Sequence, residues 1–91
     1  MVNQLRKILE ILEYEIGCEN SIWDKQQLIC IVKPEMEELY DHFANGRVFF
    51  KYGKNQRMFE STYIITDSIK NLKNTSLGKE IIKLQRKYNK L

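Results

Sequence analysis

Apolar residues recur at helical spacing along the first part of the chain. Successive members of this stripe are three or four positions apart, which is the periodicity of an amphipathic helix with one broad buried face. The positions are Val2, Leu5, Leu9, Leu12 and Ile16, with Ile8 and Ile11 widening the stripe. Gly17 follows the last of them and is a typical helix end. The pattern therefore predicts a helix over residues 2–16.

The second apolar stretch, residues 21–32, is less regular. Ser21 is a candidate N-cap, and Asp24 suits the first turn of a helix that begins there. The run LICIV is typical of a buried strand and of a buried helix alike, but its continuity with SIWDKQQ favours the helix. The residues expected to be buried are Trp23, Leu28, Ile29, Cys30, Ile31 and Val32.

Pro34 divides this stretch from the next. Proline removes a helical N–H, so either a new helix starts at Pro34 or one long helix kinks there. For a new helix, Glu35, Glu37 and Glu38 would lie favourably near the positive end of the dipole. The buried stripe expected here consists of Met36, Leu39, Tyr40 and Phe43.

The chain turns or stops at Asn45-Gly46. After it, VFFKY and RMFES flank GKNQ, an arrangement that fits a short β-hairpin. A helical extension broken at Gly53 fits the same letters. The insertion around residues 46–56 is therefore a short hairpin, an irregular segment or a helix, and these alternatives stay open.

Helical spacing returns in the second half of the chain. A stripe from Asn55 onward predicts one helix, a break at Asn74-Thr75-Ser76 caps the next, and Gly78 permits a close helix contact. The first stripe is Met58, Thr62, Ile65, Ile69 and Leu72, with Phe59 and Tyr63 beside it, and the last is Leu77, Ile81, Leu84, Tyr88 and Leu91. The pattern predicts an all-α fold in one domain, residues 1–91, as a compact antiparallel bundle of four or five helices.

Composition supports a small globular domain. The chain has 91 residues, of which 43% are hydrophobic and 30% charged. It has no apolar run near the roughly 18 residues that cross a bilayer, and charges interrupt its N-terminus, so we expect no membrane span and a cytoplasmic location. Cys18, partly exposed, and Cys30, buried, are expected to be free thiols.

Charge is distributed unevenly along the chain. Residues 1–45 contain four basic and nine acidic side chains, whereas residues 46–91 contain eleven basic and three acidic ones. One explanation, which we favour, is that the acidic and basic halves face each other and set helix pairing. The other is that the basic half faces outward and meets an acidic partner.

The stretch NGRVFFKYGKNQR, residues 45–57, combines basic and aromatic side chains without an acid. Its candidate partner-binding residues are Arg47, Phe49, Lys51, Tyr52, Lys54 and Arg57. Basic and aromatic side chains together suit a protein interface, and they also suit phosphates and stacked bases. In the simplest interpretation, which we favour, Val48 and Phe50 pack on the bundle and the lysines are solvated. Tyr40, Phe49 and Tyr52 are the aromatic residues expected at the surface.

No motif predicts catalysis. Glu38, Asp41 and His42 lie at helical spacing and are candidate metal ligands, but His42 is the only histidine and a solvated helix face explains the cluster more simply. The chain has no phosphate loop, no dinucleotide fingerprint and no nucleophile motif. We therefore expect no enzyme activity, no metal and no cofactor.

A small, basic, helical chain of this kind is similar to bacteriocin immunity proteins in size, charge and expected fold, although no motif is shared. The resemblance implies a bacterial cytosolic bundle that recognises a protein partner and performs no chemistry. The sequence thus favours a small non-enzymatic protein-interaction module of the regulatory or immunity type. The alternative is a nucleic-acid-binding protein that uses residues 47–57 and the C-terminal helix. A homodimer is left open.

Overall fold

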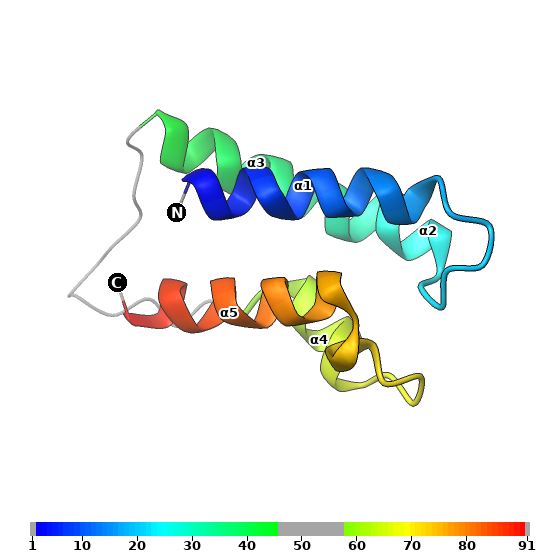
Figure 1. The fold of residues 1–91 in the computed structure, drawn as a ribbon. Helices are drawn as coiled ribbons and strands as arrows, with labels where there is room; N and C mark the ends of the chain where they lie inside the picture. Colours follow the sequence, from blue (N-terminus) through cyan, green and yellow to red (C-terminus); the bar gives the residue numbers. More distant parts are fainter. Residues whose placement is uncertain (1, 46–57, 91) are drawn as a thin grey trace.

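The computed structural model describes residues 2–45 and 58–90, and both ranges are helical, with no strand in either (Figure 1). The elements are α1 (Val2–Ile16), α2 (Lys25–Gln27), η1 (Leu28–Val32), α3 (Lys33–Ala44), α4 (Glu60–Thr66), η2 (Leu72–Asn74) and α5 (Ser76–Lys90). η1 is a π-helical turn and η2 a 3-10 turn. The all-helical prediction is confirmed for these ranges, while the hairpin alternative for residues 46–56 lies outside them.

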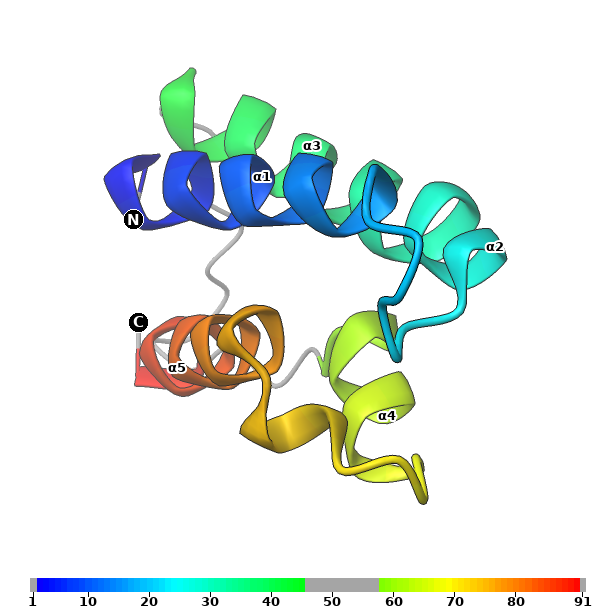
Figure 2. The same cartoon turned by 45° about the vertical axis from the view of Figure 1, so that its right-hand side comes forward.

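The long helices α1, α3 and α5 set the shape of the molecule. α1 runs antiparallel to α3 and to α5 and contacts both (Figure 1). α4 lies beside α5 and closes the remaining side of the core near η1 and η2 (Figure 2). The described residues thus form a compact helical globule in which one face of α1 packs on both α3 and α5.

The core is built from the stripes that the sequence predicts on α1 and α5. Leu5, Ile8 and Leu12 of α1 are buried, and Leu9, Ile11 and Ile16 pack against them at the edge. On α5 the buried stripe is Leu77, Ile81, Leu84 and Tyr88. The Tyr88 ring packs edge-on against Phe59, with centroids 5.0 Å apart, and against Phe43, with centroids 6.2 Å apart. These rings join the ends of α3, α4 and α5.

The chain around Pro34 is continuously helical, because the π-helical turn η1 runs directly into α3, and Pro34 lies in the first turn of α3. A proline ring at position 34 cannot donate to the carbonyl of Cys30 and would crowd it in a regular α-helix. The π-helical turn immediately before Pro34 relieves that conflict, and the Lys33 N–H there donates to the carbonyl of Leu28.

Two expectations for residues 21–32 are wrong. Cys30 and Ile29 are exposed, because Leu28 and Val32 bury one face of the turn and leave these two on the other. The N-cap is Asp24, whose Oδ1 accepts from the N–H groups of Gln26 and Gln27 at 2.8 and 3.2 Å. Ser21 instead donates its hydroxyl to Glu15 and accepts the Trp23 N–H at 3.1 Å.

The helix expected to run from Asn55 through Leu72 is shorter. α4 ends at Thr66, and the chain then turns through Asn71, which has the left-handed φ of 57°. Ser68 stabilises the turn by accepting the Lys70 N–H at 3.0 Å. Ile69 consequently leaves the buried stripe and is 96% exposed, and Met58 is 46% exposed, whereas Ile65 and Leu72 are buried as expected.

Candidate functional site

The residues predicted to bind a partner, Arg47, Phe49, Lys51, Tyr52, Lys54 and Arg57, lie outside the described residues. Of the aromatic residues expected at the surface, Tyr40 is described. It is half-buried at the edge of the core, and its hydroxyl oxygen lies 3.2 Å from Nη2 of Arg6 on α1. This hydrogen bond raises the pKa of Arg6. The exposed aromatic residues of the described ranges are instead Tyr14 and Tyr63.

The carboxylate and imidazole candidates lie along α3. Glu38 and Asp41 are exposed and His42 is half-buried. Across residues 2–45 and 58–90, no group of three or more His, Cys, Asp or Glu side chains is placed to hold a metal ion.

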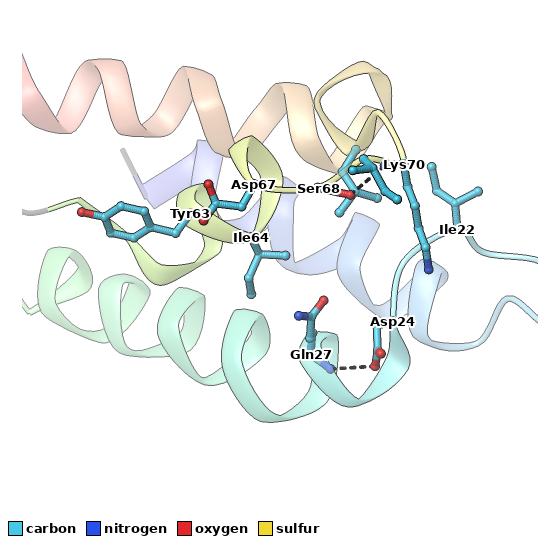
Figure 3. Close-up of a pocket in the computed structure, with 10 residues that line it drawn as sticks. Ile22, Asp24, Gln27, Tyr63, Ile64, Asp67, Ser68 and Lys70 are labelled. Carbon is cyan, nitrogen blue, oxygen red and sulfur yellow. Dashed lines mark hydrogen bonds between the residues drawn. The ribbon is translucent and has the colours of Figure 1, made fainter.

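A cleft lined by both apolar and polar side chains lies where the connection after α1 approaches the connection after α4 (Figure 3). Its volume is about 490 Å³. Its walls are Ile22, Asp24, Gln27, Tyr63, Ile64, Asp67, Ser68, Ile69, Lys70 and Leu72. In Figure 3, Ile64 of α4 points toward Gln27 at the start of the α2–η1–α3 segment. We call this feature the apolar cleft.

Three large side chains of the apolar cleft are exposed. Ile22 is 46%, Tyr63 52% and Ile69 96% exposed. The turn at residues 67–71 accounts for the exposure of Ile69, because the end of α4 and the left-handed Asn71 carry this residue away from the core. The sequence offers little warning of it, since Ile69 lies at the correct helical spacing for burial.

Charged groups border the apolar cleft. Asp24 and Asp67 supply carboxylates, and Lys70 supplies an ammonium. Asp24 already accepts two backbone N–H groups as the cap of α2. The cleft therefore combines aliphatic and aromatic surface with a rim of mixed charge, which is the composition of many protein-binding surfaces.

A buried polar junction holds the N-terminus of α4. The Glu35 carboxylate of α3 accepts the N–H groups of Glu60 and Ser61, both at 2.9 Å, and the Ser61 hydroxyl at 2.6 Å. Gln85 of α5 accepts the Phe59 N–H at 2.8 Å and the Thr62 hydroxyl at 2.9 Å. This junction was not predicted from the sequence, because a glutamate in the first turn of a helix is favourable there without any partner from another helix. Its role is structural: it fixes α4 to both neighbouring helices.

A basic surface covers α5. Its exposed cations are Lys79, Lys83, Arg86, Lys87 and Lys90. An open groove of about 550 Å³ separates part of this surface from α1, and it is lined by Asn3, Gln4, Lys7, Glu80, Lys83, Arg86 and Lys87. We call this feature the α1–α5 groove.

The ion pairs between described residues occur within each half of the chain and between the halves, so the favoured interpretation of the charge split stays a prediction. Glu13 pairs with Lys33 at 2.7 Å inside the acidic half, and this contact raises the pKa of Lys33. Glu80 pairs with Lys83 at 3.7 Å inside the basic half. The pair that joins the halves, Lys7 to Glu80 at 3.3 Å, takes its base from the acidic half. The basic side chains of α5 are exposed.

Among the helices described, none has both the length and the apolar composition needed to span a bilayer. No family model, curated protein or solved structure matches the chain.

Proposed function

We propose that this protein is a small non-enzymatic interaction module, of the regulatory or immunity type, whose protein partner binds the apolar cleft. The observation that supports the proposal is Ile69, an isoleucine almost entirely in water that lines the same cleft as the exposed side chains of Ile22 and Tyr63. Single exposed apolar residues are ordinary, but several that line one cleft are typical of an interaction site.

Burial of Ile69 by a partner would stabilise the complex. Transfer of a fully exposed isoleucine side chain out of water contributes about 1.5–3 kcal/mol. A partner that covers Ile69 and also contacts Ile22 and Tyr63 would gain this contribution from Ile69 alone. Aromatic and aliphatic anchors in a cleft of this kind commonly dominate the binding free energy of an interface.

The chemistry of the cleft indicates the kind of partner segment that it accepts. A large apolar side chain suits the space beside Ile64 and Leu72, and a basic neighbour suits the Asp67 carboxylate on the rim. We therefore propose a protein segment in which an aliphatic or aromatic residue lies next to a lysine or arginine. A cytoplasmic partner in a bacterial cell is the setting that the sequence favours.

The test is affinity capture from extract of the native cell with the wild-type chain and with Ile69→Lys. We expect the partner retained by the wild type to be retained at least about tenfold less by the variant, because the lost burial exceeds the 1.4 kcal/mol that corresponds to a factor of ten. Treatment of the extract with nuclease should leave capture unchanged.

Ile29→Lys is the matched control. Ile29 is 50% exposed on η1 and does not line the apolar cleft, so this variant makes the same chemical change elsewhere. It should capture the partner as well as the wild type does. Equal capture by Ile69→Lys and the wild type, or equal losses in both variants, would reject the apolar cleft as the binding site.

A further inference from the structure

A second surface, on α5, has a different chemistry. Lys79, Lys83, Arg86 and Lys90 follow one another at steps of four, three and four, so they form a row along one side of the helix. Adjacent members are about 4.5–6 Å apart along the axis, and the row is about 17 Å long. All four are exposed, and the apolar stripe of α5 faces the other way into the core.

The α1–α5 groove lies alongside this row and shares Lys83 and Arg86 with it. Arg86 and Lys87 line it from α5, and Lys7 lines it from α1. Its one acidic member, Glu80, lies 3.3 Å from Lys7 and 3.7 Å from Lys83, and its side chain is only 14% exposed. Because one carboxylate is shared by two ammonium groups, the groove keeps a surplus of positive charge, to which Arg86 and Lys87 contribute.

Gln4 adds a hydrogen-bonding group that lacks a partner. Its Oε1 atom is shielded from water and accepts no hydrogen bond in the structure. Gln4 lines the α1–α5 groove together with Asn3, next to the cations. A buried carbonyl oxygen without a donor is unfavourable, so a ligand that displaces the side chains covering Oε1 and brings a donor to it would be stabilised there.

We propose that the α1–α5 groove and the cationic row of α5 bind single-stranded nucleic acid. The phosphates would follow the row of lysines and Arg86, and an unpaired base or a ribose hydroxyl would donate to Gln4. Arginine and lysine neutralise phosphates, and amide side chains read the edges of unpaired bases. Phosphates supply the negative charge and the nucleoside supplies the donor, so one ligand satisfies both features.

The surroundings of α5 disfavour a membrane as the ligand. An interfacial helix inserts its apolar face among the lipids, but Leu77, Ile81 and Leu84 of α5 are fully buried in the protein core. The α1–α5 groove also lies toward the end of the molecule where both termini lie, whereas the apolar cleft lies at the opposite end (Figure 1). The inferred nucleic-acid site is thus separate from the proposed protein-binding site.

The test is direct titration of purified protein into a fluorescein-labelled oligouridylate of about twelve nucleotides, followed by anisotropy. Affinity should fall with salt at a slope of log K against log salt of about −2 to −3, as expected for three or four phosphate contacts on a single strand. Lys83→Gln, Arg86→Gln and Lys87→Gln combined should weaken binding at least tenfold.

Three variants separate a site from general charge attraction. Lys25→Gln, Lys70→Gln and Lys73→Gln combined remove the same charge from exposed residues outside the α1–α5 groove, and should change affinity less than threefold. Gln4→Leu should weaken binding several-fold while leaving the salt slope unchanged, because it removes a neutral contact. Ile69→Lys should bind the oligonucleotide as well as the wild type does.

Competing ligands are included in the same titration. Polyglutamate and vesicles containing anionic phospholipid should compete at least tenfold more weakly than the oligonucleotide. The inference is overturned by absence of binding at low salt, by equal losses in the two triple variants, or by polyglutamate or vesicles that compete as well as the oligonucleotide. None of these results bears on the apolar cleft, because no protein partner is present.

Discussion

Gly78 shows how one residue limits the packing of α5. A Cβ atom built at this position would lie 2.0 Å from the Leu72 carbonyl oxygen and 2.9 Å from its carbon. Both contacts are with backbone, so a rotamer change cannot relieve them. The glycine lets the first turn of α5 lie directly against η2, where Thr75 donates its hydroxyl to the Leu72 carbonyl at 2.6 Å and accepts the Gly78 N–H at 3.0 Å.

Gly78→Ala should therefore destabilise the protein, although alanine is the better helix former by about 1 kcal/mol. We expect a net loss of about 2–3 kcal/mol in the free energy of unfolding, because η2 and α5 must separate to admit the methyl group. Urea unfolding followed by far-ultraviolet circular dichroism measures the change.

Gly17→Ala is the matched control for that prediction. A Cβ atom at Gly17 would meet its nearest atoms, the Glu13 and Tyr14 carbonyl oxygens, at 3.6 and 3.7 Å, which are ordinary contacts. This variant should unfold within about 0.5–1 kcal/mol of the wild type. If Gly78→Ala were equally stable, the close approach of η2 to α5 would be wrong.

Among the helical elements, α4 depends most on its neighbours. It has only seven residues, too few to be stable alone in water. Its N-cap residue, Phe59, has no side chain that can accept the N–H groups of the first turn. Glu35 and Gln85 supply those acceptors from α3 and α5, so α4 is capped by tertiary contacts.

Glu35→Ala should remove that cap and destabilise α4. It leaves the part-buried N–H group of Glu60 and the buried N–H group of Ser61 without the carboxylate, for which we expect a loss of about 3 kcal/mol. Amide hydrogen exchange should accelerate in α4 more than in α1. Glu35→Gln, which keeps one acceptor oxygen, should lose about 1–2 kcal/mol.

Glu37→Ala tests whether the effect of Glu35 belongs to its position. Glu37 is an exposed glutamate of the same helix, so its removal should change stability by no more than about 0.5 kcal/mol. Similar losses in Glu35→Ala and Glu37→Ala would contradict the capping role of Glu35.

In the whole molecule, Trp23 reports on the contact between the two halves of the chain. It is the only tryptophan, is buried, and donates its ring N–H to Thr75 Oγ1 at 3.3 Å. Trp23 precedes α2, whereas Thr75 precedes α5, so this hydrogen bond joins segments 52 residues apart. Its environment therefore depends on the packing of both halves.

We expect tryptophan fluorescence and circular dichroism to give the same urea midpoint. Buried residues of α1, α3 and α5 belong to one hydrophobic cluster, so we expect tertiary contact and helix content to be lost together. Two separated midpoints would instead show that the halves unfold independently, against the single-domain prediction.

Apolar periodicity was sufficient to predict the helices α1 and α5 and their buried stripes. Leu5, Ile8 and Leu12 on α1, and Leu77, Ile81 and Leu84 on α5, are buried as expected. These helices are long and regular, so the spacing of three and four residues identifies the inner face without knowledge of the partner helix. The residues of the cationic row of α5 are spaced by three and four residues as well, so they share the face opposite to the buried stripe.

The positions of Ile69, Cys30 and Glu35 were decided by tertiary structure. Ile69 has the spacing of a core residue, but α4 ends before it and the turn through Asn71 exposes it. Cys30 lies in a run of apolar residues, so the spacing alone cannot identify which face is buried. The π-helical turn decides this face. Glu35 is buried because the N-terminus of α4, which is distant in sequence, supplies its hydrogen bonds. Periodicity is a local property, whereas the end of a helix and the burial of a charge depend on the elements that meet there.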